Sequence, residues 1–310
     1  MMSETPGVMW NTAILLANAF EVTTKAVRND PMSYRTVLFA IDEDSCAEPH
    51  IDYAAQLARS FDARLVGLGC HRPTPWPSAG AVAFIAGDPL TIELREAEEA
   101  AVAREGIFLQ RCRLAGLPAS QAILENFELA SAVCRHALFA DLVVMTQPRL
   151  TDIHHPERLR RAHVILQESV RPVLMLAQAG GFAPLPGTVV VAWDGSASAA
   201  RAAASALPLM RRARNVHLVQ VIDPRKDDEG AVRPGLECAS TWLSGHGIEA
   251  LIGIVEGDHP ARSLLSKTAD VGAELLVMGA WGHGRLVERL LGGATRAMVD
   301  GMAVPVMFAH

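Results

Sequence analysis

Short apolar runs, most of them ending in a polar residue or glycine, recur along the chain, with helical segments between them. In the C-terminal half these runs have the length and aliphatic composition of strands buried on both faces. The predicted strands lie near 188–193, 216–222, 249–255, 274–279 and 304–308. The predicted helices lie near 197–213, 231–246, 259–272 and 294–301. This alternation predicts an α/β fold with a doubly wound open parallel sheet, whose ligands bind beyond the carboxyl ends of the strands.

The same pattern occurs twice in the chain. Residues 37–42 match 189–194 at an offset of 152, and two later segments match at an offset of 133, namely 140–145 with 273–278 and 170–175 with 303–308. Repeated segments in the same order indicate two copies of one domain. We therefore expect two tandem Rossmann-like sheets. The predicted parts are an N-terminal extension, 1–32, and two domains, 33–179 and 187–310.

The two offsets differ by 19 residues, so the first copy carries an insertion. Residues 72–90 contain four prolines and two glycines, which predicts a loop between the second strand and second helix of that copy.

Composition narrows the class of protein. The net charge of −6 and a pI near 6.0 argue against a general nucleic-acid binder. Five scattered cysteines without a C-x-x-C pair predict neither a disulfide framework nor a zinc site. Residues 8–20 are apolar but lack a preceding basic region, and no run is long enough to span a membrane. We expect a soluble cytoplasmic protein that contacts neither nucleic acid nor membrane.

The segment 278–295 carries the clearest chemical signal. It leaves an apolar strand, passes through several glycines and enters a helix. Glycines let backbone N–H groups approach an anion, and a helix N-terminus favours negative charge. The segment is therefore a candidate phosphate cradle, although it fits neither the Walker A nor the Rossmann glycine pattern. Tight turns without any ligand are the alternative interpretation.

The spacing of Gly279, Gly282 and Gly292 resembles the nucleotide-binding motif of the universal stress proteins, G-x-x-G, nine residues, then G followed by Ser or Thr. Segments 191–196, 219–223, 255–260 and 303–306 also resemble strands and loops of that family. The resemblance implies a stress-response regulatory module that binds ATP or a related adenine nucleotide, with Mg²⁺ as an accompanying ion. It also implies an internal pseudo-dimer, paired through the last strands of the two copies, 172–176 and 305–309.

The resemblance assigns the nucleotide site residue by residue. Asp194 and Val221 lie at the adenosine side, and the loop and phosphate positions are Met278, Gly279, Gly282, Gly292, Gly293 and Ala294. Gly293 replaces the family's Ser or Thr, and Thr295 is a candidate substitute. Loss of one hydrogen bond to a charged phosphate weakens binding by about 1.5–3 kcal/mol.

The first copy departs from this motif. The residues aligned with Gly279, Gly282, Gly292 and Gly293 are Thr146, Arg149, Leu159 and Arg160. We therefore expect no such nucleotide site there. Four arginines, at 149, 158, 160 and 161, predict a solvated basic face or, alternatively, a surface for an acidic partner or phosphates.

Other candidate residues favour ordinary roles. Ser196 is expected to cap the following helix, and Asp194 to bind or cap rather than to catalyse. His154, His155 and His163 lack further ligands at a suitable spacing, so no metal site is expected. Two alternative functions remain, a nucleotide-independent binding scaffold and a slow ATPase. A homodimer or a regulatory protein partner is compatible with each.

Overall fold

The structure is a computed structural model, and it describes residues 33–42, 47–70, 88–280 and 293–310. The predicted extension 1–32 lies outside the described residues. The strands of the first half are β1 (Thr36–Ile41), β2 (Arg64–Cys70), β3 (Gln121–Glu125), β4 (Leu142–Thr146) and β5 (Val173–Leu176). The helices between them are α2 (Ala47–Ser60), α4 (Asp88–Leu114), α5 (Leu129–Ala137) and α6 (His155–Glu168).

The second half repeats this alternation. Its strands are β6 (Thr188–Ala192), β7 (Asn215–Ile222), β8 (Ala250–Glu256), β9 (Leu275–Gly279) and β10 (Val306–Ala309). Its helices are α7 (Ala197–Met210), α8 (Glu229–Gly245), α9 (Pro260–Asp270) and α10 (Gly293–Gly301). The strands and helices predicted for this half are confirmed, with ends that differ by at most three residues.

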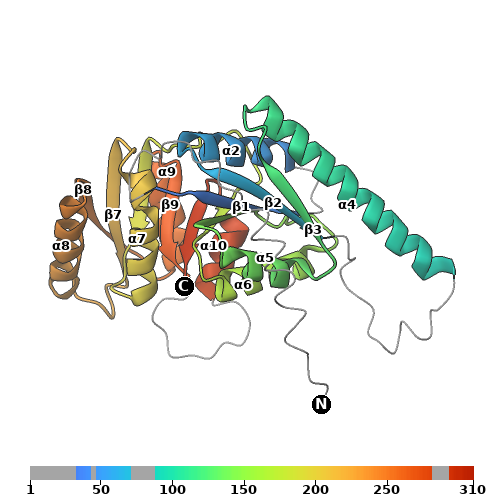
Figure 1. The fold of residues 1–310 in the computed structure, drawn as a ribbon. Helices are drawn as coiled ribbons and strands as arrows, with labels where there is room; N and C mark the ends of the chain where they lie inside the picture. Colours follow the sequence, from blue (N-terminus) through green and yellow to red (C-terminus); the bar gives the residue numbers. More distant parts are fainter. Residues whose placement is uncertain (1–32, 43–46, 71–87, 281–292) are drawn as a thin grey trace, which may run out of the picture. The chain divides into compact units, whose positions relative to one another are not determined.

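The two predicted sheets join into one sheet of ten strands, in the order β3-β2-β1-β4-β5-β10-β9-β6-β7-β8 (Figure 1). Every neighbouring pair is parallel except β5 and β10, which are antiparallel and place Met175 opposite Val306 and Val173 opposite Phe308. The predicted pairing of the last strands is therefore confirmed, and the internal pseudo-dimer is a continuous sheet.

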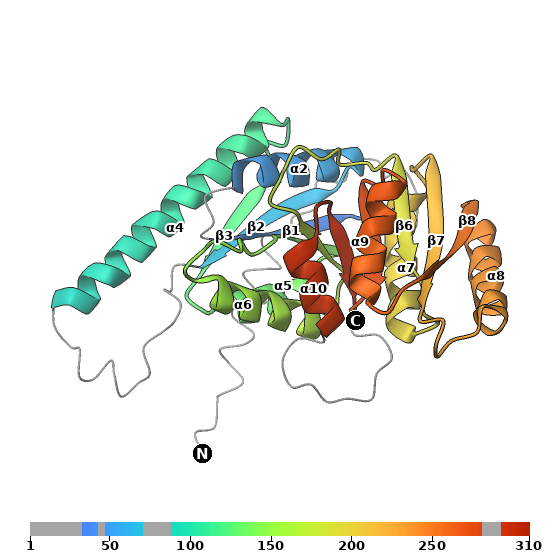
Figure 2. The same cartoon turned by 180° about the vertical axis from the view of Figure 1, so that it is seen from behind.

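Helices cover the sheet on both faces (Figure 2). In the first half α2 packs against α4, and α5 packs against α6. In the second half α9 packs against α10, while α7 lies against β9 and β10. This doubly wound arrangement leaves the carboxyl ends of the strands as the place where the connecting loops meet.

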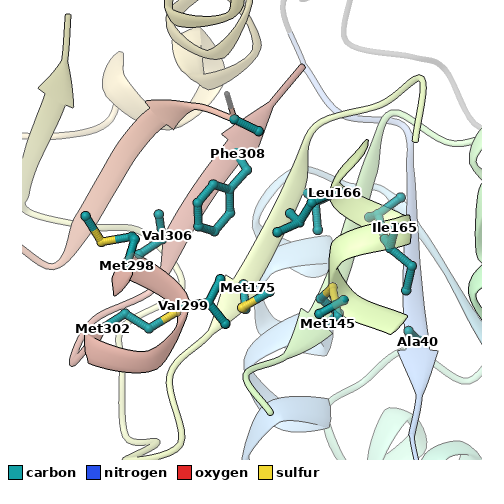
Figure 3. Close-up of a cluster of buried hydrophobic side chains, with 14 of the residues drawn as sticks. Ala40, Met145, Ile165, Leu166, Met175, Met298, Val299, Met302, Val306 and Phe308 are labelled. Carbon is teal, nitrogen blue, oxygen red and sulfur yellow. The ribbon is translucent and has the colours of Figure 1, made fainter. Parts of the chain in front are cut away.

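A buried core crosses the seam between the halves (Figure 3). Met145, Ile165 and Met175 come from the first half, and they belong to one cluster with Val306 and Phe308 of the second. All five side chains are at most 5% exposed. Polar contacts also cross the seam: the Gln147 side-chain amide donates to the Val299 carbonyl at 2.6 Å, and the Tyr34 hydroxyl donates to the Ser205 carbonyl at 2.7 Å.

The predicted insertion appears in part as a longer helix. Residues 71–87 lie outside the described residues, but α4 begins at Asp88, so the predicted loop is wrong for 88–90. With 27 residues, α4 exceeds its counterpart α8 by ten. Within the described part of the chain, no helix is long and apolar enough to cross a membrane.

Candidate functional site

The order of the strands reverses at β6 in the second half. The chain runs from β6 outward to β7 and β8 and then returns to place β9 on the other side of β6. In open α/β sheets generally, ligands bind beyond the carboxyl ends of the strands at such a switch point. The predicted residues Asp194, Met278 and Gly279 lie at these two strand ends.

The loop after β6 is built to hold Asp194 at the exposed end of the strand. The Asp194 carboxylate accepts a hydrogen bond from the Ser196 N–H at 2.9 Å, and Gly195 between them has a φ of +74°. The Ser196 hydroxyl then accepts from the Ala199 N–H at 3.1 Å, which confirms the predicted helix cap. The aspartate therefore presents a fixed, exposed carboxylate beside the first turn of α7.

Gly279 has a packing role that the motif did not indicate. A Cβ atom at this position would lie 2.7 Å from the Ala199 backbone nitrogen and 2.6 Å from the Ser198 hydroxyl. Glycine therefore lets the first turn of α7 approach the end of β9. The neighbouring Met278 side chain is 8% exposed and belongs to the core, so its backbone is the part available to a ligand.

The ends of β7 and β8 contribute a charged group that the sequence analysis did not single out. Val221 is partly buried and pairs with Val255 of β8. Just beyond it, the Asp223 carboxylate accepts hydrogen bonds from Arg225 at 3.0 and 3.2 Å, and these bonds together with Lys226 hold its pKa well below the usual value. Arg225 also lies 3.8 Å from Asp258, which links the loops after β7 and β8. The sequence could have indicated this charged group, because Asp223 is followed closely by Arg225 and Lys226.

Helix α10 begins at Gly293, whose N–H is among those that an α-helix leaves without a partner at its start. Ala294 follows it, and Thr295 is 3% exposed. Gly282 and Gly292 lie outside the described residues. The described part of the predicted site thus consists of strand ends and one helix N-terminus.

In the first half, an arginine occupies the position that aligns with Ala294 of α10. Arg161 of α6 aligns with Ala294, and its guanidinium donates to the Asp42 carboxylate at the end of β1 at 2.6 Å. The Arg161 side chain is 5% exposed and that of Asp42 is 18% exposed. Asp42 aligns with Asp194. In the first half this aspartate is therefore paired with an arginine of the same chain, whereas Asp194 is exposed.

The predicted solvated basic face is wrong for Arg158 and Arg161. Arg158 is 9% exposed, and its Nε lies 3.1 Å from the Asp152 carboxylate. Arg160 does face solvent, with a side chain that is 62% exposed. Arg161 meets Asp42, which is 119 residues away along the chain and is not revealed by the local sequence, whereas the acidic neighbour of Arg158 is Asp152 in the turn just before α6.

Neighbouring polar groups complete the closed edge of the first half. Thr146, which aligns with Gly279, lies 3.1 Å from Nδ1 of the buried His50 through its hydroxyl. The Glu125 carboxylate lies 2.9 Å from Nε2 of His136. Burial raises the pKa of the Cys70 thiol to about 12, so it remains protonated at neutral pH.

Among the described residues, no group of three or more His, Cys, Asp or Glu side chains could hold a metal ion.

The fold and the strand-end geometry define a tandem α/β protein with a Rossmann-like sheet in each half. A family model described as the universal stress protein family matches residues 33–175 and 187–310. These matches cover most of the chain, and the chain therefore belongs to the universal stress protein family.

Solved structures show the same fold. A universal stress protein from Archaeoglobus fulgidus DSM 4304 is 17% identical with a TM-score of 0.66, covering 88% of this chain and 97% of its own. A functionally unknown protein from Pseudomonas aeruginosa PAO1 is 16% identical with a TM-score of 0.52, covering 90% and 93%. A putative universal stress protein from P. aeruginosa UCBPP-PA14 is 15% identical with a TM-score of 0.50, covering 90% and 94%. No curated protein sequence matches the chain.

Proposed function

We propose that the second half binds ATP or a related adenine nucleotide at the carboxyl ends of β6, β7 and β9, and that nucleotide occupancy regulates contacts with partner proteins during stress. One contrast carries the proposal. In the middle of α6 the first half has Arg161, which pairs with Asp42, whereas the second half has Ala294, near the start of α10, at the position aligned with Arg161. Only the second half combines a short side chain there with an exposed aspartate.

The described residues fit an adenine nucleotide. Asp194 offers carboxylate oxygens at the switch point, a position suited to accept hydrogen bonds from a ribose. Val221, at the end of β7, gives an apolar contact for the base, and the N-terminus of α10 suits the phosphates. Mg²⁺ accompanying the nucleotide would be held chiefly by phosphate oxygens and water, and we assign it no protein ligand among the described residues.

The phosphate end of this site is weaker than in the family's motif. Gly293 supplies a backbone N–H but no hydroxyl. Thr295, the proposed substitute, has a side chain that is largely buried, which limits how much of its hydroxyl faces a ligand in this conformation. We therefore propose binding that is weaker than the family motif supports, by the cost of about one charged hydrogen bond, roughly 1.5–3 kcal/mol.

Isothermal titration of the full chain with ATP tests the proposal. Ala294→Arg introduces an arginine at the position aligned with Arg161, and we expect it to abolish measurable binding because its guanidinium would pair with Asp194 as Arg161 pairs with Asp42. Ala297→Arg is the matched control, since it adds the same charge at an exposed position of the same helix. Gly282→Asp, chosen from the motif, should act like Ala294→Arg.

The outcomes separate the candidate functions. Binding by the wild type and by Ala297→Arg, but not by Ala294→Arg, supports a nucleotide site in the second half. If the wild type gives no heat of binding up to millimolar ATP, the proposal fails and the nucleotide-independent scaffold is favoured. Equal binding by the wild type and all variants would show that the nucleotide site does not include the start of α10.

A further inference from the structure

Strand β8 forms one end of the ten-stranded sheet (Figures 1 and 2). It pairs with β7 along all seven of its residues, and within the described part of the chain no strand pairs with its other side. Of these residues, Leu251 is 60% exposed and Ile252 is 36% exposed. The strand at the opposite end, β3, has no exposed residue and packs against α4. Of the two end strands, therefore, β8 is the one that presents large exposed apolar side chains.

Strand β8 lacks the features that keep edge strands apart in soluble proteins. Such strands commonly carry a lysine or a proline, or a bulge that twists the edge away from a partner. β8 contains neither residue, and its register with β7 is continuous from Ala250 to Glu256. Glu256, at the last position, is its single charged residue. The outer edge of β8 is thus open to pairing with a further strand.

One hydrogen bond fixes which backbone groups of β8 face outward. Just beyond the strand, the Gly257 N–H donates to the Ile222 carbonyl of β7 at 2.9 Å. The N–H and C=O of one strand residue point to the same side, and that side alternates along the strand. Counting back from Gly257, the residues whose backbone groups point away from β7 are Ala250, Ile252, Ile254 and Glu256. An incoming strand would therefore hydrogen-bond to these residues.

The sequence of β8 is complementary to itself in the antiparallel direction. When two copies are aligned about Gly253, Ile252 of one copy lies opposite Ile254 of the other, and Leu251 lies opposite Val255. Gly253 then opposes its own copy between two hydrogen-bonded pairs, where facing Cα atoms approach to about 4.5 Å. Each large apolar side chain of the strand thereby meets another one, and glycine occupies the closest approach.

The same alignment suits the charges and the hydrogen bonds. Glu256 lies opposite Ala250 and not opposite another acid, and all the outward-facing residues fall in hydrogen-bonded pairs. A two-fold axis perpendicular to the sheet keeps each side chain on its own face, so it passes beside a residue. Moving it by one residue, to Ile252 or Ile254, would place Glu256 opposite an isoleucine and leave part of the edge unpaired.

The chain already contains a joint of this kind, because antiparallel β5 and β10 join its two copies of the fold over three residue pairs. Strand β8 offers seven residues for the same purpose. We propose that a second copy of this chain docks on the outer edge of β8, with the two β8 strands antiparallel about a two-fold axis at Gly253. The two ten-stranded sheets then form one continuous sheet. The interface is separate from the seam and does not depend on the proposed nucleotide site.

Sedimentation velocity of the full chain without nucleotide tests the position of the axis. We expect a dimer for the wild type and a dissociation constant raised at least about tenfold in Gly253→Lys and in Gly253→Asp, because like charges then meet at the axis. An equimolar mixture of the two variants should dimerise again, since each interface pairs a lysine with an aspartate. A Cβ atom added at Gly253 meets nothing closer than 3.7 Å, so both variants should fold. A monomeric wild type, or a mixture that stays monomeric, overturns the proposal.

A second pair of variants tests the backbone pairing. Ile252→Pro removes one outward-facing N–H and leaves the hydrogen bonds to β7 in place, so it should also raise the dissociation constant at least about tenfold. Ile252→Thr is the matched control, because it shortens the apolar side chain but keeps the N–H and the branched Cβ, and it should weaken the dimer less than Ile252→Pro. Far-ultraviolet circular dichroism checks that each variant is folded. A dimer that is equally stable in the wild type and in folded Ile252→Pro would place the contact elsewhere and overturn the proposal.

Discussion

At the scale of single residues, the two halves differ most at the pair formed by Asp42 and Arg161. The sequence analysis identified Asp42 as the counterpart of Asp194 and found that the glycines were missing in the first half. It did not predict that Arg161 is buried, because its partner is 119 residues away along the chain. Local patterns predict helix faces well, but they carry little information on a contact of that separation.

The same pair gives a prediction for stability. Arg161→Leu should lower the free energy of unfolding by about 3 kcal/mol, because it leaves the largely buried Asp42 carboxylate without its cation. Asp42→Asn in the same chain should recover much of that loss, since no charge is then left uncompensated. Urea denaturation of the wild type, each single variant and the double variant measures the coupling between the two positions.

The control for this experiment is Arg160→Leu, which removes the neighbouring exposed arginine of α6. It should change the free energy of unfolding by less than about 0.5 kcal/mol. Strictly additive effects of Arg161→Leu and Asp42→Asn would show that the ion pair does not stabilise the fold.

At the scale of elements, the strands and helices of the second half could be predicted from the sequence. Ser196, followed by an alanine-rich stretch, indicated the start of α7, and its hydroxyl does cap that helix. The start of α4 could not be predicted, because the prolines and glycines before it suggested a loop as far as residue 90. Gly279 was assigned to a phosphate loop, and only the geometry shows that it also accommodates α7.

Gly279 should therefore be sensitive to substitution even without nucleotide. Gly279→Ala should lower the free energy of unfolding by about 1–3 kcal/mol, since the added methyl group meets the backbone of α7, which cannot move aside easily. Gly301→Ala is the comparison, because its added Cβ meets only the flexible end of Leu265 at 2.9 Å. Thermal and urea denaturation without ligand would contradict the packing role if the two variants were equally stable.

At the scale of the whole described structure, the seam determines how the halves depend on each other. Strands β5 and β10 join the two halves into one sheet, and a single core cluster includes side chains from both (Figure 3). The repeat in the sequence predicted the pairing of the last strands. The merging of the two cores could not be read from the sequence, since the apolar side chains of each half equally suit a separate core.

A shared core implies that the halves unfold together. Phe308 is 1% exposed, lies opposite Val173 across the seam and belongs to the shared cluster. Phe308→Ala should therefore cost about 3–5 kcal/mol and lower hydrogen-exchange protection in β4 and β5 as well as in β9 and β10. Leu236→Ala, in the buried face of α8 far along the sheet from the seam, is the control. It should reduce protection around β7 and β8 and leave the first half protected under conditions where local opening dominates exchange. If Phe308→Ala left β4 and β5 fully protected while β9 and β10 exchanged, the halves would be independent folding units joined only by their edge strands.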